Sequence, residues 1–167
     1  DFKHVMANGK IAMKLPEGDR IVGVAICDAN DDILLSGRRG KCIRFPVIDV
    51  RVFKSRDSVG VRGIRLVGDD ELIAMSIVRH AEFDSDTRDR YLRWSNARRR
   101  AEGEGESSAD PLPSAPEQAD EMAAAEQFVL SITENGYGKR TSAYEYRVTG
   151  RGGQGIINIE ASDRNGP

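Results

Sequence analysis

Cysteine is scarce in this chain: Cys27 and Cys42 are the only two among 167 residues, and they are not spaced as CxxC. Each lies in a stretch of alternating apolar residues, so we expect two reduced core thiols rather than a disulfide or a metal site. No run of about 18 apolar residues occurs, which excludes a membrane-spanning helix. A starting methionine and a secretory signal pattern are also lacking. These absences favour a piece of a longer cytoplasmic protein.

Clustered metal ligands and catalytic groups are also few. His4 and His80 stand alone in the sequence, which favours surface or structural roles. The acidic pairs at 31–32 and 69–70 fall at expected hairpin tips, where aspartate favours the turn. We therefore predict no catalytic residue, no metal and no cofactor in this chain.

An overall positive charge is missing, because 25 Lys and Arg face 27 Asp and Glu, for a net charge of −2. The balance is uneven along the chain. Residues 81–126 hold 6 basic and 12 acidic residues, which leaves 19 basic and 15 acidic residues elsewhere. Outside that segment the chain is mildly basic, and its positive charge is grouped at 38–41, 51–65 and 139–151.

What the chain does contain is an internal repeat. An alternating stretch with a turn at Gly40 recurs 96 residues later with a turn at Gly136, and the same shift places Arg44 on Arg140 and Arg51 on Arg147. A half copy begins at Gly9. Repetition at roughly 40–50 residues is typical of propeller-like blades.

Alternation of apolar and polar residues predicts the strands of these blades. They are expected at 10–15, 20–27, 32–36, 41–45, 61–66, 71–78, 127–133, 137–141 and 155–161. Glycine or Asn/Asp pairs separate them, as in tight hairpins. We predict an all-β fold of small antiparallel sheets: part of one blade at 1–28, a full blade at 29–80 and most of a further blade at 127–167.

An acidic, partly helical insertion is predicted at 81–126. Residues 86–100 can form a helix that carries Tyr91, Leu92 and Trp94, with Trp94 in the docking anchor. Ser114-Ala-Pro-Glu117 is a capping-box sequence, so a second helix is expected from near Pro116. Between the helices, 102–113 has the composition of a linker.

Two runs in the repeats match a known family. The residues Thr-Glu-Asn-Gly-Tyr-Gly-Lys-Arg-Thr at 133–141, with 155–159 and 164–166 after them, resemble the C-terminal DNA-wrapping domain of the bacterial DNA gyrase A protein. So do 60–66 and 68–70. The resemblance covers all but the insertion. It implies a partial β-pinwheel, a propeller variant whose blades exchange strands.

The resemblance also implies a function. This domain of the family is non-catalytic and wraps DNA, which supports ATP-dependent negative supercoiling by the bacterial, cytoplasmic, chromosome-associated holoenzyme. The implied partners are double-stranded DNA, the remaining gyrase A domains and the gyrase B protein in an A2B2 heterotetramer, with no membrane. ATP and Mg would be used by other domains. None of Tyr91, Tyr137, Tyr144 and Tyr146 has the basic setting expected of the breakage tyrosine.

Basic side chains that recur at equivalent turns and connections are the predicted DNA contacts, since wrapping needs phosphate neutralisation along an arc and no base-reading element. Solvated hairpin faces are the alternative, as are ion pairs of Arg62 or Arg65 with Asp69, Asp70 or Glu71. The predicted set is Arg38, Arg39, Lys41, Arg44, Arg51, Lys54, Arg56, Arg62, Arg65, Lys139, Arg140, Arg147 and Arg151.

Other readings stay open. Family members carry a Gln-Arg-Arg-Gly-Gly-Lys-Gly box, and the nearest stretch here, 150–155, keeps its glycines and one arginine only. We therefore expect weak wrapping by this chain alone. The topoisomerase IV equivalent, or a propeller-like protein-interaction module without DNA, are the alternatives. The insertion is an interaction site, an acidic competitor of DNA, or a neutral decoration.

Overall fold

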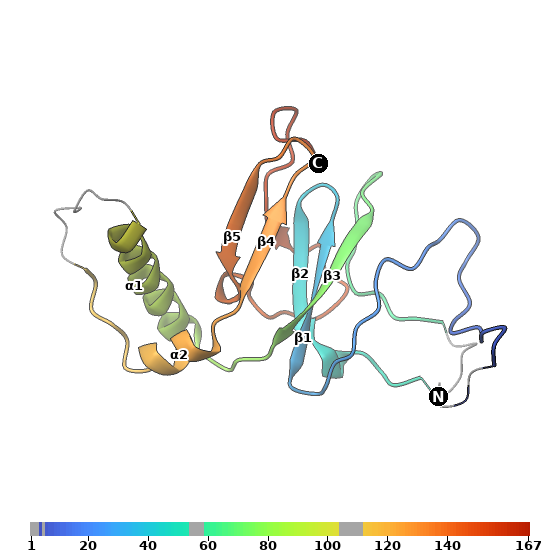
Figure 1. Ribbon diagram of the computed structural model, residues 1–167, viewed down its shortest axis with the longest axis horizontal. Helices are drawn as coiled ribbons and strands as arrows, with labels where there is room; N and C mark the ends of the chain where they lie inside the picture. The colour runs from blue at the N-terminus through green and yellow to red at the C-terminus, as the bar shows by residue number, and fades with distance from the viewer. Residues whose placement is uncertain (1–3, 5, 54–58, 104–111) are drawn as a thin grey trace.

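The computed structural model describes residues 4, 6–53, 59–103 and 112–167. Two small antiparallel sheets occupy the middle of the molecule. Helices α1 and α2 lie at one end, and the extended N-terminal segment lies at the other (Figure 1). This arrangement confirms the predicted fold class of antiparallel sheets with a helical insertion.

The larger sheet is built on a hairpin of β1 (Asp31–Gly37) and β2 (Lys41–Pro46). Strand β3 (Leu72–Arg79) pairs with β1, and the short β6 (Ile156–Ile157) pairs with β2, so the order is β3-β1-β2-β6. Gly40 turns the hairpin at a φ of 81°, which glycine adopts readily.

The smaller sheet repeats the hairpin of the larger one. Its strands are β4 (Phe128–Ile132) and β5 (Gly138–Ser142), joined at Gly136 with a φ of 82°. Each hairpin ends in a 3-10 turn, η1 (Val47–Asp49) or η2 (Ala143–Glu145), and these turns are offset by the 96 residues of the sequence repeat. The predicted strands in both hairpins are confirmed.

Strand β6 crosses between the two repeats. It follows β5 in the chain but pairs with β2, with Lys41 opposite Ile157 and Cys42 opposite Ile156. The next two amides, of Asn158 and Ile159, both donate to the carbonyl oxygen of Gly40. One blade is therefore completed by a strand of the next, as the pinwheel resemblance implies.

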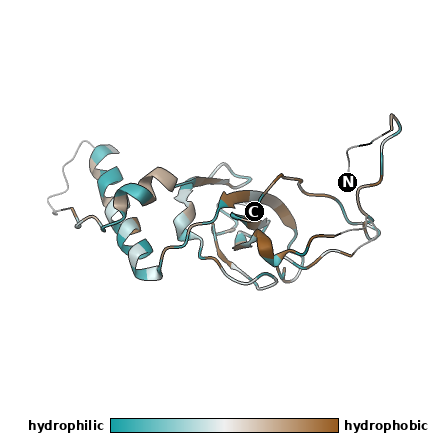
Figure 2. Cartoon of the chain, turned by 90° about the horizontal axis from the view of Figure 1, so that it is seen from below, coloured by the Kyte–Doolittle hydropathy of each residue, from teal (hydrophilic) through white to brown (hydrophobic). Residues whose placement is uncertain are grey.

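Apolar residues gather in the sheets, while α1 is largely hydrophilic (Figure 2). One cluster, with Leu34, Cys42, Val78 and Tyr146 at its centre, lies between the two sheets. A second, around Leu35, Ile43 and Phe45, lies in the larger sheet, and Ile64 packs against it. The sheets and the segment at 61–66 are thus joined by burial of apolar surface.

Three of the predicted strands are wrong. Residues 10–15, 20–27 and 61–66 have no strand conformation, and they form no ladder with the rest of the chain that the structure describes. The alternation of apolar and polar residues specifies which side chains share a face. A strand also needs a neighbouring strand whose backbone groups can form hydrogen bonds with its own. Outside a sheet, Val24 and Ile26 are almost fully exposed, and Cys27, which was expected in the core, is exposed as well. The strand expected at 155–161 is shortened to β6.

Both helices of the insertion are present, α1 at Ser85–Gly103 and α2 at Ala119–Ala125. Helix α2 starts later than predicted, after a turn at 117–118, and its N-cap residue Gln118 makes no side-chain capping bond. The predicted anchor packs as expected: Tyr91 is 1% exposed, Leu92 and Trp94 are partly buried beside it, and the cluster includes Met122 of α2 and Tyr144 of η2. Most of the predicted linker lies outside the described residues.

Candidate nucleic-acid interface

Arg44 lies in the interior, which corrects its prediction as a phosphate contact. The residue is 4% exposed, and its guanidinium pairs with the fully buried carboxylate of Asp32 at 2.8 Å. It also donates to the carbonyl oxygens of Ala143, Tyr146 and Arg79. The Arg44 side chain therefore connects the two sheets and is not available to contact DNA.

The repeat explains why Arg140, the equivalent of Arg44, remains on the surface. The residue equivalent to Asp32 is Phe128, so no buried carboxylate draws the Arg140 side chain inward. Its guanidinium instead lies over the Phe128 ring, 3.7 Å from the centroid. A contact with an aromatic ring leaves the charge of the guanidinium unneutralised, so Arg140 remains a candidate for phosphate binding.

The turn at 38–40 is basic in sequence but is neutralised in the structure. Arg38 pairs with Glu71 at 3.3 Å and with Glu134 at 2.9 Å, and Arg39 pairs with Asp69. Glu134 occupies the position of Arg38 in the next repeat, so the two hairpin tips are joined by one ion pair. We call Arg38 and Arg39 with these acidic partners the turn cluster.

The electrostatics of the turn cluster agree with its geometry. The hydrogen bond and charge of Arg39 hold the pKa of Asp69 below its usual range, so this carboxylate is ionised at neutral pH. Asp70 accepts hydrogen bonds from the backbone amides of Arg39 and Glu71. A phosphate here would meet carboxylates as well as arginines, which makes the turn cluster a poor anion site.

A different set of arginines is brought together by two connections. The amide of Arg65 donates to the carbonyl of Gly153, and that of Gly152 donates to the carbonyl of Gly63. The segments at 61–66 and 147–155 therefore lie side by side, although they belong to different repeats. Arg151 joins them further, since its guanidinium donates to the carbonyl oxygens of Arg62 and Asp49.

We define the connection surface as the exposed arginines of these segments, Arg62, Arg65, Arg147 and Arg151, together with Arg51, which follows Asp49 by two residues. None of them has an acidic partner among the residues that the structure describes, so the alternative of pairing with Asp69, Asp70 or Glu71 does not hold for Arg62 or Arg65. Carbonyl oxygens leave the charge of Arg151 intact, and the Phe53 ring does the same for Arg51, at 4.7 Å. Among the described residues, the positive charge of this surface is thus left without an acidic partner.

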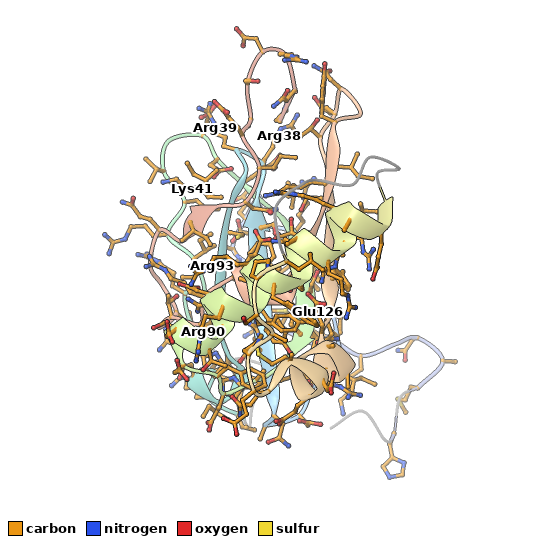
Figure 3. The ribbon with its side chains drawn as sticks, turned by 90° about the vertical axis from the view of Figure 1, so that its left-hand side faces the viewer. Arg38, Arg39, Lys41, Arg90, Arg93 and Glu126 are labelled. Atoms are coloured by element: carbon orange, nitrogen blue, oxygen red, sulfur yellow. The ribbon has the colours of Figure 1, made fainter. Side chains whose placement is uncertain are left out.

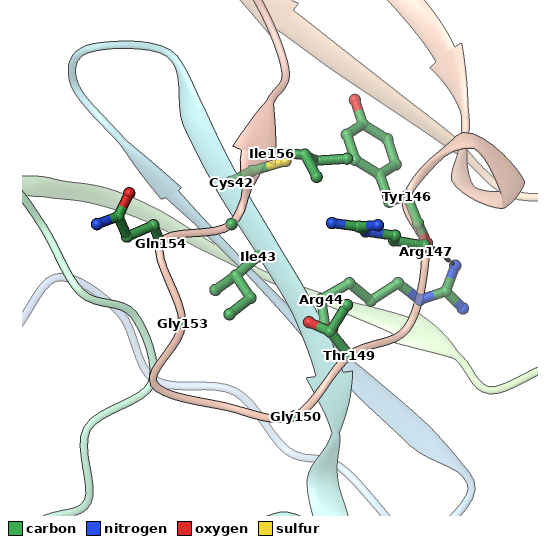
Figure 4. Close-up of a pocket in the computed structure, with 11 residues that line it drawn as sticks. Cys42, Ile43, Arg44, Tyr146, Arg147, Thr149, Gly150, Gly153, Gln154 and Ile156 are labelled. Atoms are coloured by element: carbon green, nitrogen blue, oxygen red, sulfur yellow. Dashed lines mark hydrogen bonds between the residues drawn. The ribbon is translucent and has the colours of Figure 1, made fainter.

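The loop that carries Arg147 and Arg151 lies across β2. A shallow pocket opens between them, lined by Cys42, Ile43 and Arg44 of β2 and by the loop from Tyr146 to Ile156 (Figure 4). Thr149 fastens the loop, because its amide and hydroxyl donate to the carbonyl of Arg44. The position of Arg147 and Arg151 is therefore set by the backbone of β2.

The remaining predicted residues that the structure describes lie on β2 and β5. Lys41 is half-buried on β2, while Lys139 and Arg140 are exposed on β5 and have no acidic partner in the described ranges. Lys139 lies near Cys42: burial raises the pKa of that thiol to about 11, and the lysine charge acts against the rise. Lys54 and Arg56 lie outside the described residues.

The hydroxyl groups of three tyrosines are used in hydrogen bonds within the chain. Tyr91 donates to Glu126, Tyr144 to the carbonyl of Met122 and Tyr146 to Asn158. Burial raises the pKa of all three phenols, so they are neutral hydroxyls at physiological pH. Among the described residues, no cluster of side chains fits a metal ion, and no helix is long and apolar enough to cross a membrane.

A family model described as DNA gyrase C-terminal domain, beta-propeller, matches residues 6–28, 31–79 and 127–165. The chain belongs to the DNA gyrase C-terminal domain family. The segments that match are those that form the repeats, and the segment with both helices is not matched. The resemblance found in the sequence is confirmed.

Relatives along the whole chain carry the name of the A subunit of DNA gyrase. The protein from Granulibacter bethesdensis is 48% identical over 182 residues, and the one from Rickettsia bellii is 45% identical over 169 residues. Each alignment covers 99% of this chain and 19% of the relative. The protein from Salmonella typhimurium is 31% identical over 166 residues, which cover 99% of this chain and 14% of that protein. The chain thus spans a fifth or less of these relatives.

Proposed function

We propose that this chain binds double-stranded DNA through the connection surface and that it serves DNA wrapping by a gyrase. The observation that carries the proposal is the meeting of two arginine-bearing connections from successive repeats. Their guanidinium groups are exposed and uncompensated among the described residues, as contacts to phosphate require.

The form of the surface favours binding without sequence preference. The basic residues of this surface stand on connecting segments and not on a helix. Phosphate contacts position a duplex but carry no sequence information directly. Contacts repeated on successive blades would spread along a bent duplex, which distributes the bending cost of about 1–6 kcal/mol for a short site.

In the full-length protein, this binding would support ATP-dependent negative supercoiling. The partners would be the other gyrase A domains and the gyrase B protein in an A2B2 assembly, in the cytoplasm. ATP and Mg would act in other domains, and this chain would contribute no catalytic residue. The names of the relatives support gyrase over topoisomerase IV.

A gel-shift titration at two salt concentrations tests the proposal. Linear duplexes of two unrelated sequences should bind equally, and binding should weaken steeply as the salt concentration rises. Binding that is indifferent to salt, or confined to one of the two duplexes, would contradict it. No binding by the full-length protein would favour the protein-interaction module instead.

A further inference from the structure

All of the basic charge in the insertion is on α1. The helix carries six arginines and three acidic residues, whereas the segment 81–126 as a whole has twice as many acidic as basic residues. The family model does not match this segment. The family fold therefore does not account for the concentration of arginines on α1.

The arginines of α1 are sorted by helical periodicity. One side of the helix is buried through Thr87, Tyr91 and Ser95, at spacings of four residues. Arg93 and Arg100 are exposed on another side, seven residues apart and so nearly in line along the helix. Figure 3 shows Arg90 and Arg93 on the side of α1 away from Glu126, and on the same side of the view as Lys41.

The charges on this outer side have few acidic partners in the ranges that the structure describes. Arg93 and Arg100 have no acidic partner in the described ranges; Arg93 donates only to the carbonyl of Asp89. Arg90 pairs with Asp86, and Arg98 with Glu102, as exposed pairs four residues apart on the helix. Such pairs contribute about 0.3–0.5 kcal/mol, so a phosphate can replace the carboxylate at little cost.

The first half of α1 lies against η2, which leads into the loop of the connection surface. A hollow here is lined by Arg88, Asp89, Leu92, Arg93 and Asn96 of α1 and by Tyr144 and Glu145 of η2, and Asp89 pairs with Arg88. Glu145 stands two residues before Arg147, which belongs to the connection surface. The basic side of the helix therefore begins where the loop at 147–155 leaves η2.

The second half of α1 borders the basic strand β5. Arg99 of the helix and Arg140 of β5 both lie over the Phe128 ring, at 4.9 and 3.7 Å from its centroid. Arg99 is held there by Glu126, whose two carboxylate oxygens are 2.6 Å from its Nη2 atom. Helix α1 thus packs on η2, which precedes Arg147, and shares the Phe128 ring with Arg140 of β5.

We infer that the outer side of α1 is an additional phosphate-binding strip, which extends the connection surface and holds the same DNA duplex; this inference rests on the proposed function. Arg93 and Arg100 are about 10 Å apart along the helix axis, at 1.5 Å per residue. That length spans about three phosphates of one DNA strand. The contacts would be to the backbone alone.

An acidic protein fits this side of the helix less well than DNA. Tight protein interfaces are built around buried aromatic or aliphatic anchors. The large apolar residues of α1 are already used, because Tyr91, Leu92 and Trp94 pack in the cluster with Tyr144. The outer side offers arginines without an apolar centre, and a phosphate backbone needs no such centre.

The test is DNA binding by the full-length protein with R93E/R100E, measured by gel shift at several salt concentrations. Loss of two phosphate contacts predicts binding roughly 10- to 100-fold weaker at 0.1 M salt, and a slope of log affinity against log salt that is shallower by about 1.8. The matched control R93K/R100K keeps both charges and should bind within about twofold of the wild type, since phosphate neutralisation needs only charge. Both residues are exposed, so the melting temperature should not change; R93Q/R100Q repeats the test with a smaller change of charge.

A variant of the connection surface separates failure of this inference from failure of the proposed function. Charge reversal of Arg62, Arg65, Arg147 and Arg151 removes contacts of the connection surface and leaves α1 untouched. If that variant binds DNA weakly while R93E/R100E binds normally, the proposed function stands and the α1 strip is overturned. If neither variant weakens binding, both are overturned.

Discussion

Single residues decide which basic side chains of this molecule are structural and which are available. Arg44 is drawn inside by Asp32, and the same carboxylate accepts a second bond from Nδ1 of His80 at 2.7 Å. His80 is thus structural, as its isolation in the sequence predicts. The equivalent Arg140 is left outside because a phenylalanine stands where Asp32 would be. The sequence repeat predicts that Arg44 and Arg140 are equivalent. Whether each arginine is buried or exposed depends on the presence of the carboxylate of Asp32.

Replacement of Arg44 tests the buried pair. Arg44→Ala leaves Asp32 buried without its cation, and we expect unfolding to become easier by about 3–5 kcal/mol. Arg140→Ala is the matched control at the equivalent position, and should cost less than about 1 kcal/mol because its cation–π contact is exposed. Urea unfolding followed by circular dichroism measures both. Equal losses for the two variants would contradict the assignment of Arg44 to the core.

The two cysteines should differ in reactivity. Cys27 is exposed and Cys42 is 1% exposed, and burial raises the pKa of the Cys42 thiol from 9.0 to about 11. We expect a thiol reagent at pH 8 to modify Cys27 at once and Cys42 only on unfolding. Rapid modification of both thiols in the folded chain would show that β2 is not buried as described.

The raised pKa of Cys42 also makes stability depend on pH. Because the pKa of this thiol is higher in the folded than in the unfolded chain, its contribution to stability is present below pH 9 and is lost as pH rises from 9 toward 11.

At the scale of elements, the hairpins were predictable and their exchange partner was not. Alternation together with turn residues specifies β1, β2, β4 and β5, because each hairpin closes on itself. Strand β6 pairs with β2 of the preceding repeat. The sequence pattern of 155–161 does not show which two of its residues will form that pairing. The strands predicted at 10–15, 20–27 and 61–66 are wrong for the same reason. Their residues alternate as in a strand, but the sequence does not show whether a pairing strand is present, and no ladder forms there among the described residues.

Gly40 should control the exchange of β6. A Cβ atom there would overlap the carbonyl oxygen of Ile159, while one at Gly136 would meet nothing within 4 Å. Gly136→Ala should cost only the strain of a positive φ, about 1–2 kcal/mol. Gly40→Ala should cost more and should speed hydrogen exchange at the amides of Asn158 and Ile159, which donate to Gly40. Unchanged protection of those two amides would mean that β6 is not held at this turn.

The insertion should be dispensable for the sheets. The two apolar clusters of the sheets contain no residue from 82–125, whereas the cluster of the helices reaches the blades through Tyr144. Deletion of 82–125 is therefore expected to keep the sheets folded and to lower stability through exposure of Tyr144. Hydrogen exchange of β1, β2 and β3 checks this. Loss of protection throughout those strands would make the insertion part of the core.

At the scale of the whole molecule, charge is segregated in a way that composition hides. The sequence predicts basic repeats and an acidic insertion, and it identifies the candidate residues by their recurrence. It does not predict which of them find acidic partners, because Arg38 meets Glu134 and Arg39 meets Asp69 only when the hairpins are folded. Nor does it predict that 61–66 meets 147–155, since that contact depends on the path of the loop over β2. The connection surface is a product of the fold.

The most direct test compares two charge-reversal variants of the full-length protein in DNA-binding titrations across a range of salt concentrations. Reversal at the connection surface, R62E/R65E/R147E/R151E, should make the slope of log affinity against log salt shallower by about 3.6, which corresponds to four phosphate contacts. Reversal at the turn cluster, R38E/R39E, should change it by much less, because those charges are already paired within the molecule. A larger loss from R38E/R39E than from the connection-surface variant would contradict the account.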